Sequence, residues 1–136
     1  MFNNCRFTLI QGDTNVRIGD PPAGLVEWRK KFDAPERDRD KDAILMFMVA
    51  GLTAADSDVE VVIHNDSGDH SVGHIQHHNG ANRHHWFTQV ISIGPNVLTW
   101  SDNEIRIKAK EYAGGTPPHD LYDDFFIRDV VCFYTG

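Results

Sequence analysis

NEIRIKAK, at residues 103–110, decides the fold, because its apolar and charged side chains alternate strictly. On an extended chain Ile105 and Ile107 point to one side, and the charged side chains point to the other: Glu104, Arg106 and Lys108. DDFFIRDVVCFY, at residues 123–134, reads as another strand. The two stretches predict the β-strands that close a sandwich.

Working outward from these strands, the rest of the chain shows short apolar–polar segments separated by turn residues, with no convincing helical stripe. Eight strands are predicted, at residues 6–12, 25–32, 43–52, 59–65, 71–78, 85–93, 103–110 and 125–134. The proline- and glycine-rich segments 19–24 and 114–120 are predicted loops. We expect an all-β protein, a two-sheet antiparallel β-sandwich of the jelly-roll type, in a single domain over residues 1–136.

Composition and charge exclude several classes of protein. At 136 residues and 15.4 kDa the chain is long enough to bury its own core. No apolar run approaches the roughly 20 residues of a membrane span, and no signal peptide is visible, so we expect a soluble protein. The net charge of −7 repels phosphate backbones, which argues against a nucleic-acid partner.

The segment AILMFMVAGL, at residues 43–52, is apolar on both faces. A strand tolerates this when it is central and covered on both sides, or when it packs against a partner subunit. Both explanations stay open at this point. The second predicts homo-oligomers.

Cys5 and Cys132 fall in the first and last predicted strands. If those strands pair, the two thiols could be neighbours. Two cysteines are too few for a disulfide-dense secreted scaffold, and two buried free thiols that behave as small apolar groups are the favoured interpretation.

The order of motifs along the chain resembles a known superfamily. The elements are VEVVIHN at residues 59–65, Val72 with Gly73, the strand at 86–93, Asn103 before Ile105 and Ile107, and the final pattern of Phe125, Ile127, Asp129 and Val130. Together they are similar to the second half of a galactose-binding-like jelly roll, over residues 43–136. The resemblance implies a carbohydrate-binding module, a lectin or an accessory domain of glycoside-processing enzymes, often with a structural calcium ion. Individual ligand residues cannot be carried over.

A sugar site needs an aromatic face beside groups that hydrogen-bond hydroxyls. The candidates in or beside loops are Trp100, Asp102, Asn103, Tyr112, His119 and Tyr122. For the two tyrosines, packing in the core is an equally good explanation. Trp28 and Trp86 lie within strands, where core packing explains them better.

Seven of the eight histidines lie between His64 and His85. If the strands on either side of residues 79–83 form a hairpin, His78 could face His84, or His77 could face His85. Such a pair could hold zinc, nickel or copper with a third ligand. The alternatives are an exposed polar hairpin without metal, which is favoured, and a pH-responsive cluster. The loop carboxylates Asp120 and Asp123 could bind calcium, although solvated turn residues are the commoner outcome.

No spacing of residues defines a catalytic triad or a pair of carboxylates in one cleft, so we expect a protein that is not an enzyme. The first interpretation is a non-catalytic carbohydrate-binding module. The alternative is a structural protein that forms homo-oligomers through β-sandwich contacts, with residues 43–52 or an open strand edge at the interface. A third interpretation is a metal- or pH-responsive hairpin rich in histidine.

Overall fold

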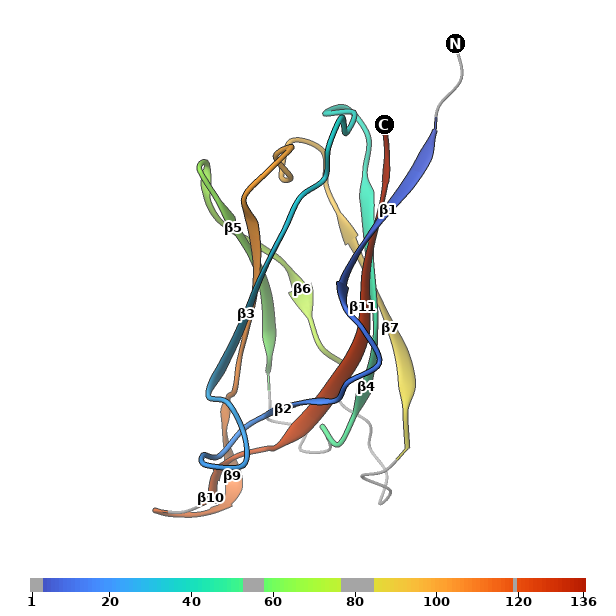
Figure 1. The fold of residues 1–136 in the computed structure, drawn as a ribbon. Coiled ribbons are helices and arrows are strands. Elements are labelled where there is room, and N and C mark those ends of the chain that lie inside the picture. The colour runs from blue at the N-terminus through green and yellow to red at the C-terminus, as the bar shows by residue number, and fades with distance from the viewer. Residues whose placement is uncertain (1–3, 53–57, 77–84, 119) are drawn as a thin grey trace.

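A computed structural model describes residues 4–52, 58–76, 85–118 and 120–136, which form an all-β protein (Figure 1). The eleven strands are β1 (Cys5–Gln11), β2 (Val16–Ile18), β3 (Glu27–Phe32), β4 (Ala43–Ala50), β5 (Glu60–Asn65), β6 (Gly68–His74), β7 (Phe87–Ile93), β8 (Asn103–Lys108), β9 (Glu111–Thr116), β10 (Asp120–Tyr122) and β11 (Phe125–Thr135). Within those ranges the chain has no helix, and therefore no helical segment that could cross a membrane.

Two antiparallel sheets lie against each other. The first has the order β1-β11-β4-β7, with β2 added to β11, and the second has the order β3-β8-β5-β6. Four consecutive connections lead from β3 to β7. Three of them take the chain from one sheet to the other, and the fourth joins β5 to its neighbour β6 within one sheet. This alternation, with the first strand beside the last, is the jelly-roll arrangement and confirms the predicted fold class.

All eight predicted strands occur, with ends that shift by a few residues. The predicted strand at 71–78 begins earlier and ends at His74. The segment 114–120 was predicted to be a loop, and this was wrong in part, because β9 pairs with β10 there in a small two-stranded sheet. Pro117 and Pro118 do form a turn, but Thr116 and Asp120 on either side of it pair as strand residues.

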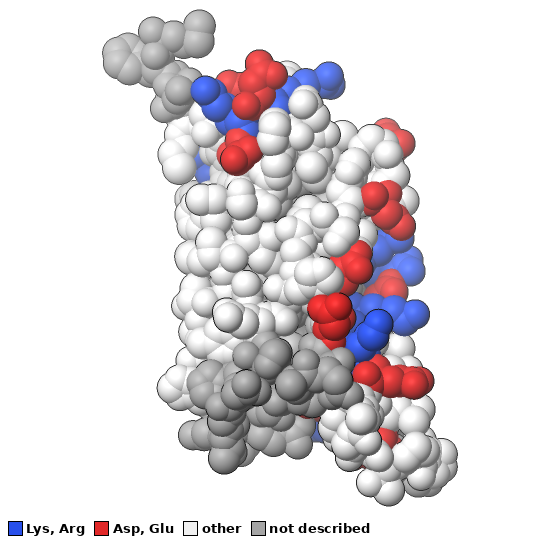
Figure 2. All heavy atoms as spheres, turned by 180° about the vertical axis from the view of Figure 1, so that it is seen from behind, with Lys and Arg blue, Asp and Glu red and all other residues white. Residues whose placement is uncertain are grey.

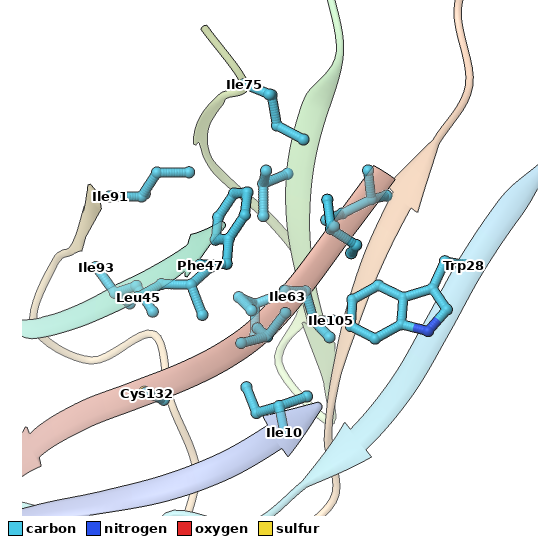
Figure 3. Close-up of a cluster of buried hydrophobic side chains, with 14 of the residues drawn as sticks. Ile10, Trp28, Leu45, Phe47, Ile63, Ile75, Ile91, Ile93, Ile105 and Cys132 are labelled. Atoms are coloured by element: carbon cyan, nitrogen blue, oxygen red, sulfur yellow. The ribbon is translucent and has the colours of Figure 1, made fainter. Parts of the chain in front are cut away.

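The core lies between the two sheets, where alternate side chains of each strand point inward (Figure 3). Leu45 and Phe47 from β4 lie across from Ile63 of β5 and Ile105 of β8, and all four are at most 1% exposed. Trp28 of β3 is also buried, as predicted. Burial of each large apolar side chain contributes roughly 1.5–3 kcal/mol, which makes this layer the main source of stability.

The terminal strands pair, but their cysteines do not meet. Cys5 lies opposite Thr135 and is exposed, whereas Cys132 lies opposite Thr8 and is buried, and both are free thiols. The prediction that both are buried was therefore wrong for Cys5, which sits on the outer side of β1. Burial raises the pKa of the Cys132 thiol to about 12.

The doubly apolar segment 43–52 forms β4, a central strand between β11 and β7. Its inward side chains, Leu45, Phe47 and Val49, are buried. On the outward side Ile44 is 44% exposed, and Met46 and Met48 are half-buried. The strand is central, as one explanation requires, but the rest of the chain covers only one of its faces.

Candidate functional site

The predicted ligand residues lie at opposite ends of the sandwich. Trp100, Asp102 and Asn103 stand where β8 begins, while Tyr112 and Tyr122 belong to the small sheet beyond its other end (Figure 1). The six residues of β8 span roughly 20 Å at about 3.3 Å per residue. The candidates therefore cannot form one binding site. His119 lies outside the described residues.

The surroundings of Asn103 are those of a residue that holds the fold together and not those of a residue that binds a ligand. Its side chain is fully buried. The Oδ1 atom accepts hydrogen bonds from the backbone N–H of Thr99 at 2.9 Å and from Asn65 Nδ2 at 3.1 Å. The Nδ2 group donates to the carbonyl oxygens of Thr99 at 2.8 Å and Phe32 at 3.4 Å. The hydrogen bonds of the Asn103 amide join the loop before β8 to β3 and β5, which leaves no group of this side chain for a ligand. The prediction that Asn103 contacts a ligand directly is therefore corrected.

Trp100 and Asp102 are both exposed. The indole of Trp100 is 58% exposed, and its Nε1–H donates to the carbonyl oxygen of Arg37 at 3.2 Å. Asp102 has a φ of 60° and donates its backbone N–H to Asp33 Oδ1 at 2.9 Å. Both residues contribute to the packing of loops at this end of the sandwich.

A pocket of about 620 Å³ lies at the other end, and we call it the basal pocket. Its lining residues include three predicted candidates, Tyr112, Asp120 and Tyr122. The other lining residues are Arg17, Asp20, Pro21, Pro22, Ala23, Gly51, Asp124 and Phe126. Folding thus brings the β9–β10 hairpin against β2 and the proline loop that follows it.

Two carboxylates tie the wall of the basal pocket together. Asp124 accepts from Arg17 Nη2 at 2.6 Å and from the backbone N–H of Asp20 at 2.8 Å. The carboxylate of Asp20 in turn accepts the backbone N–H of Leu121 at 2.9 Å. A Cβ atom at Gly19 would overlap the carboxylate of Asp124, so glycine is required for this close approach. The proline loop is therefore held in a defined position beside the hairpin.

Among the carboxylates of the basal pocket, that of Asp120 lies in a polar, half-buried position beside a tyrosine. Asp120 lies 3.3–3.4 Å from the hydroxyl of Tyr112, which donates to it. Around it the pocket presents tyrosine rings and proline rings, which are apolar surfaces, and the guanidinium of Arg17. This combination can contact the C–H groups and the hydroxyls of a polar ligand at once.

Sequence reasoning missed Arg17, Asp20 and the proline pair as pocket residues. The segment 19–24 was recognised as a loop from its glycines and prolines, but its position beside the β9–β10 hairpin depends on pairs more than 100 residues apart in the sequence. No local pattern carries that information.

A second hollow, of about 560 Å³, lies on the outer face of the β3-β8-β5-β6 sheet. Its walls carry many charged side chains, and some of these have ion-pair partners in or beside the hollow. Arg106 donates to Glu104 at 2.6 Å and lies 3.7 Å from Asp69. The bond from Arg106 lowers the pKa of Glu104, and the bond from His64 lowers the pKa of Asp69. This hollow is lined by charged side chains of both signs and by one candidate residue, Tyr122, whereas the basal pocket is lined by three of the candidates.

The described histidines are dispersed and have separate partners. His64 pairs with Asp69 at 2.5 Å, and His74 pairs with Asp58 at 2.8 Å. The predicted metal pair of His78 and His84 lies outside the described residues. The pH-responsive cluster therefore stays a prediction.

Over residues 4–52, 58–76, 85–118 and 120–136, no three or more His, Cys, Asp or Glu residues are placed to hold a metal ion together. Asp123 is only 2% exposed and is not among the residues that line the basal pocket, whereas Asp120 is. A calcium ion on Asp120 and Asp123 stays a prediction without a third described ligand.

Comparison with known proteins gives little further guidance. No protein-family model matches the chain, and no curated protein matches it. A structure of infectious bursal disease virus, Gx strain, matches with a TM-score of 0.40 and 13% identity, covering 99% of this chain and 39% of that one. A structure of the Gt strain matches with a TM-score of 0.33 and 11% identity, covering 96% of this chain and 39% of that one. The present chain therefore spans less than half the length of either. Similarities this low carry no argument, and the galactose-binding-like resemblance stays a prediction.

Proposed function

We propose that the protein is a non-catalytic carbohydrate-binding module whose basal pocket takes neutral or amino sugars. One observation carries the proposal: Tyr112, Asp120 and Tyr122, which chemistry alone nominates as sugar-binding or ion-binding residues, line the same pocket. Its volume of about 620 Å³ falls within the usual range for small-ligand sites, roughly 300–1,000 Å³.

The charge of the basal pocket narrows the ligand class. Three carboxylates, from Asp20, Asp120 and Asp124, stand against one guanidinium, from Arg17. This excess of negative charge disfavours sulfated sugars and uronic acids by like-charge repulsion. Neutral hydroxyls or an ammonium group on the sugar suit the pocket better.

A glycan array, run in parallel with calcium and with a chelator, tests this proposal. We expect selective binding of neutral or amino sugars, followed by a loss of affinity of about tenfold in Asp120→Asn, which keeps the shape but removes the charge. Asp102→Asn at the opposite end is the matched control and should bind as the parent does. A blank array in both buffers, or equal affinity of Asp120→Asn, would count against the proposal.

A structural role in homo-oligomers is the second candidate, and a different observation favours it. Phe7, Leu9 and Val90 are 69%, 60% and 55% exposed, and they lie on the outer side of the same sheet as Ile44. Exposed apolar side chains gathered on one sheet are typical of interaction surfaces. Size-exclusion chromatography with light scattering separates a monomeric binding module from an assembling protein.

A further inference from the structure

The outer side of the β1-β11-β4-β7 sheet carries apolar side chains on every strand. They are Phe7 and Leu9 of β1, Val131 and Phe133 of β11, Ile44, Met46 and Met48 of β4, and Val90 of β7. We call this set the apolar face. The outer side of the opposite sheet carries charged residues at the equivalent positions, such as Glu104, Arg106 and Lys108. The two sheets therefore differ in what they present to solvent.

Charged side chains are nearly absent from the apolar face. Among the outward positions of these four strands, all within the described ranges, the charged residues are Arg128 and Asp129 at the bulge of β11. These two lie 3.5 Å apart, and the guanidinium lies 4.1 Å above the ring of Trp86. Figure 2 shows charges gathered along the side of the other sheet and at one end, while the side of this sheet is uncharged in that view.

The strand register arranges the apolar face in rows. One row crosses the sheet as Phe7, Phe133, Ile44 and Ser92, and the next as Leu9, Val131, Met46 and Val90. The rings of Phe7 and Phe133 pack on each other with centroids 6.4 Å apart. Each row ends in a bulky residue on β1 and a smaller one on β7.

We propose that the apolar face binds the apolar face of a second copy of this chain, with a two-fold axis parallel to the strands between β11 and β4. Such an axis places Phe7 over the small Ser92 of the partner copy and Leu9 over Val90, and each contact occurs twice. Phe133 meets Ile44 near the axis. Bulky positions then face small ones across the interface, in the aligned packing that sheets adopt.

The distribution of charge favours a second copy over a charged partner. Two copies with a net charge of −7 each repel one another, and contact through the apolar face keeps the charged outer sides of the two opposite sheets apart. On each copy, the charged outer side of the opposite sheet is separated from the apolar face by at least the spacing of the two sheets, about 10 Å. This distance exceeds the Debye length of about 8 Å at physiological salt. An acidic or basic partner would find almost no charge to pair with here.

The size of the face sets the expected affinity. A third row holds Arg128, Met48 and Thr88. Four strands about 4.8 Å apart and three rows about 6.8 Å apart span a plane of roughly 400 Å² on each copy. Burial of both planes and their side chains gives an interface of about 1,000 Å², at the low end for specific complexes. We therefore expect a weak, reversible dimer and use a Kd on the order of 10–100 µM to set the concentrations of the test. The proposed dimer rests on the second candidate function, a structural role in homo-oligomers, and names its interface. It does not depend on sugar binding, because the basal pocket lies at the end of the sandwich and not on the apolar face.

Sedimentation velocity over a concentration series, from about 5 to about 500 µM around the expected Kd, tests the dimer. The wild-type chain should shift from monomer to dimer, and the shift should become stronger as salt is added. Leu9→Lys and Val90→Glu should each weaken dimerisation at least about tenfold, since each places two charges in the interface. Both residues are more than half exposed, so both variants should fold, which circular dichroism verifies. Leu25→Glu, at a similarly exposed leucine away from the face, is the matched control and should dimerise as the wild type does.

Mixing the two single variants tests the two-fold register. In the proposed dimer the lysine introduced by Leu9→Lys in one copy faces the glutamate introduced by Val90→Glu in the other, and the second such contact keeps its native Leu9 and Val90. At a concentration where each variant alone is mainly monomeric, an equimolar mixture should therefore form heterodimers. A wild-type monomer over the whole range, dimerisation of either single variant at wild-type affinity, or a mixture that stays monomeric would overturn the proposal. Glycan binding is measured separately, so failure of this interface leaves the sugar-binding proposal standing.

Discussion

Replacement of Asn103 by alanine is the sharpest test of how the loop end of the sandwich is held together. The amide makes four hydrogen bonds of 2.8–3.1 Å, to the backbone N–H, carbonyl and hydroxyl of Thr99 and to Asn65, and one of 3.4 Å to Phe32. Alanine removes all of them in a fully buried position. At about 1 kcal/mol for each of the four shorter bonds, the free energy of unfolding should fall by about 3–4 kcal/mol.

Urea denaturation followed by tryptophan fluorescence measures this loss. With a slope of about 2 kcal/mol/M for a domain of this size, the midpoint should move down by about 1.5–2 M. Asn15→Ala, at an exposed asparagine, is the matched control and should change stability by less than about 0.5 kcal/mol. A loss below about 1 kcal/mol in Asn103→Ala, with an unchanged slope, would refute the structural role and return Asn103 to the set of candidate ligand residues.

Three further predictions concern the core, the thiols and the response to acid. Phe47→Ala should cost about 3–5 kcal/mol in urea denaturation, because the ring is 1% exposed between the two sheets. Cys5 should react with a thiol reagent in the native protein while Cys132 reacts only after unfolding; equal labelling rates would contradict the structure. Because the bond from Arg106 lowers the pKa of Glu104 below its ordinary 4.5, its contribution to stability is present above that value and is lost as pH falls through the lowered pKa. This contribution to the free energy of unfolding should be less than about 1 kcal/mol. Glu104→Gln should remove it, so that denaturation curves measured above and below pH 4.5 differ less in the variant than in the wild type.

The strands were predictable because their signal is local. The alternation of Ile105 and Ile107 with charged neighbours identifies β8 and its inward face without any knowledge of the partners. The same rule places Trp28 in the core. It fails for β9, which contains two glycines, and for β10, which has only three residues; these two strands pair with each other in a separate small sheet.

The candidate site was predictable only in its chemistry. Tyr112 and Tyr122 were nominated as residues that suit a sugar and Asp120 as one that suits a cation, and all three line the same pocket. Asn103 was nominated on similar grounds, but it is buried at the far end. Residue type was equally suitable in all four, and position in the fold separated them.

By itself, the sequence determined that this protein is an all-β sandwich, because side-chain periodicity of two is a property of each segment alone. Only the tertiary structure decided which residues share a surface. The register of β1, β11, β4 and β7 gathers Phe7 and Val90 on one apolar face, and the approach of the proline loop to the hairpin builds the basal pocket. Both depend on pairings between segments far apart in the chain, which local alternation does not encode.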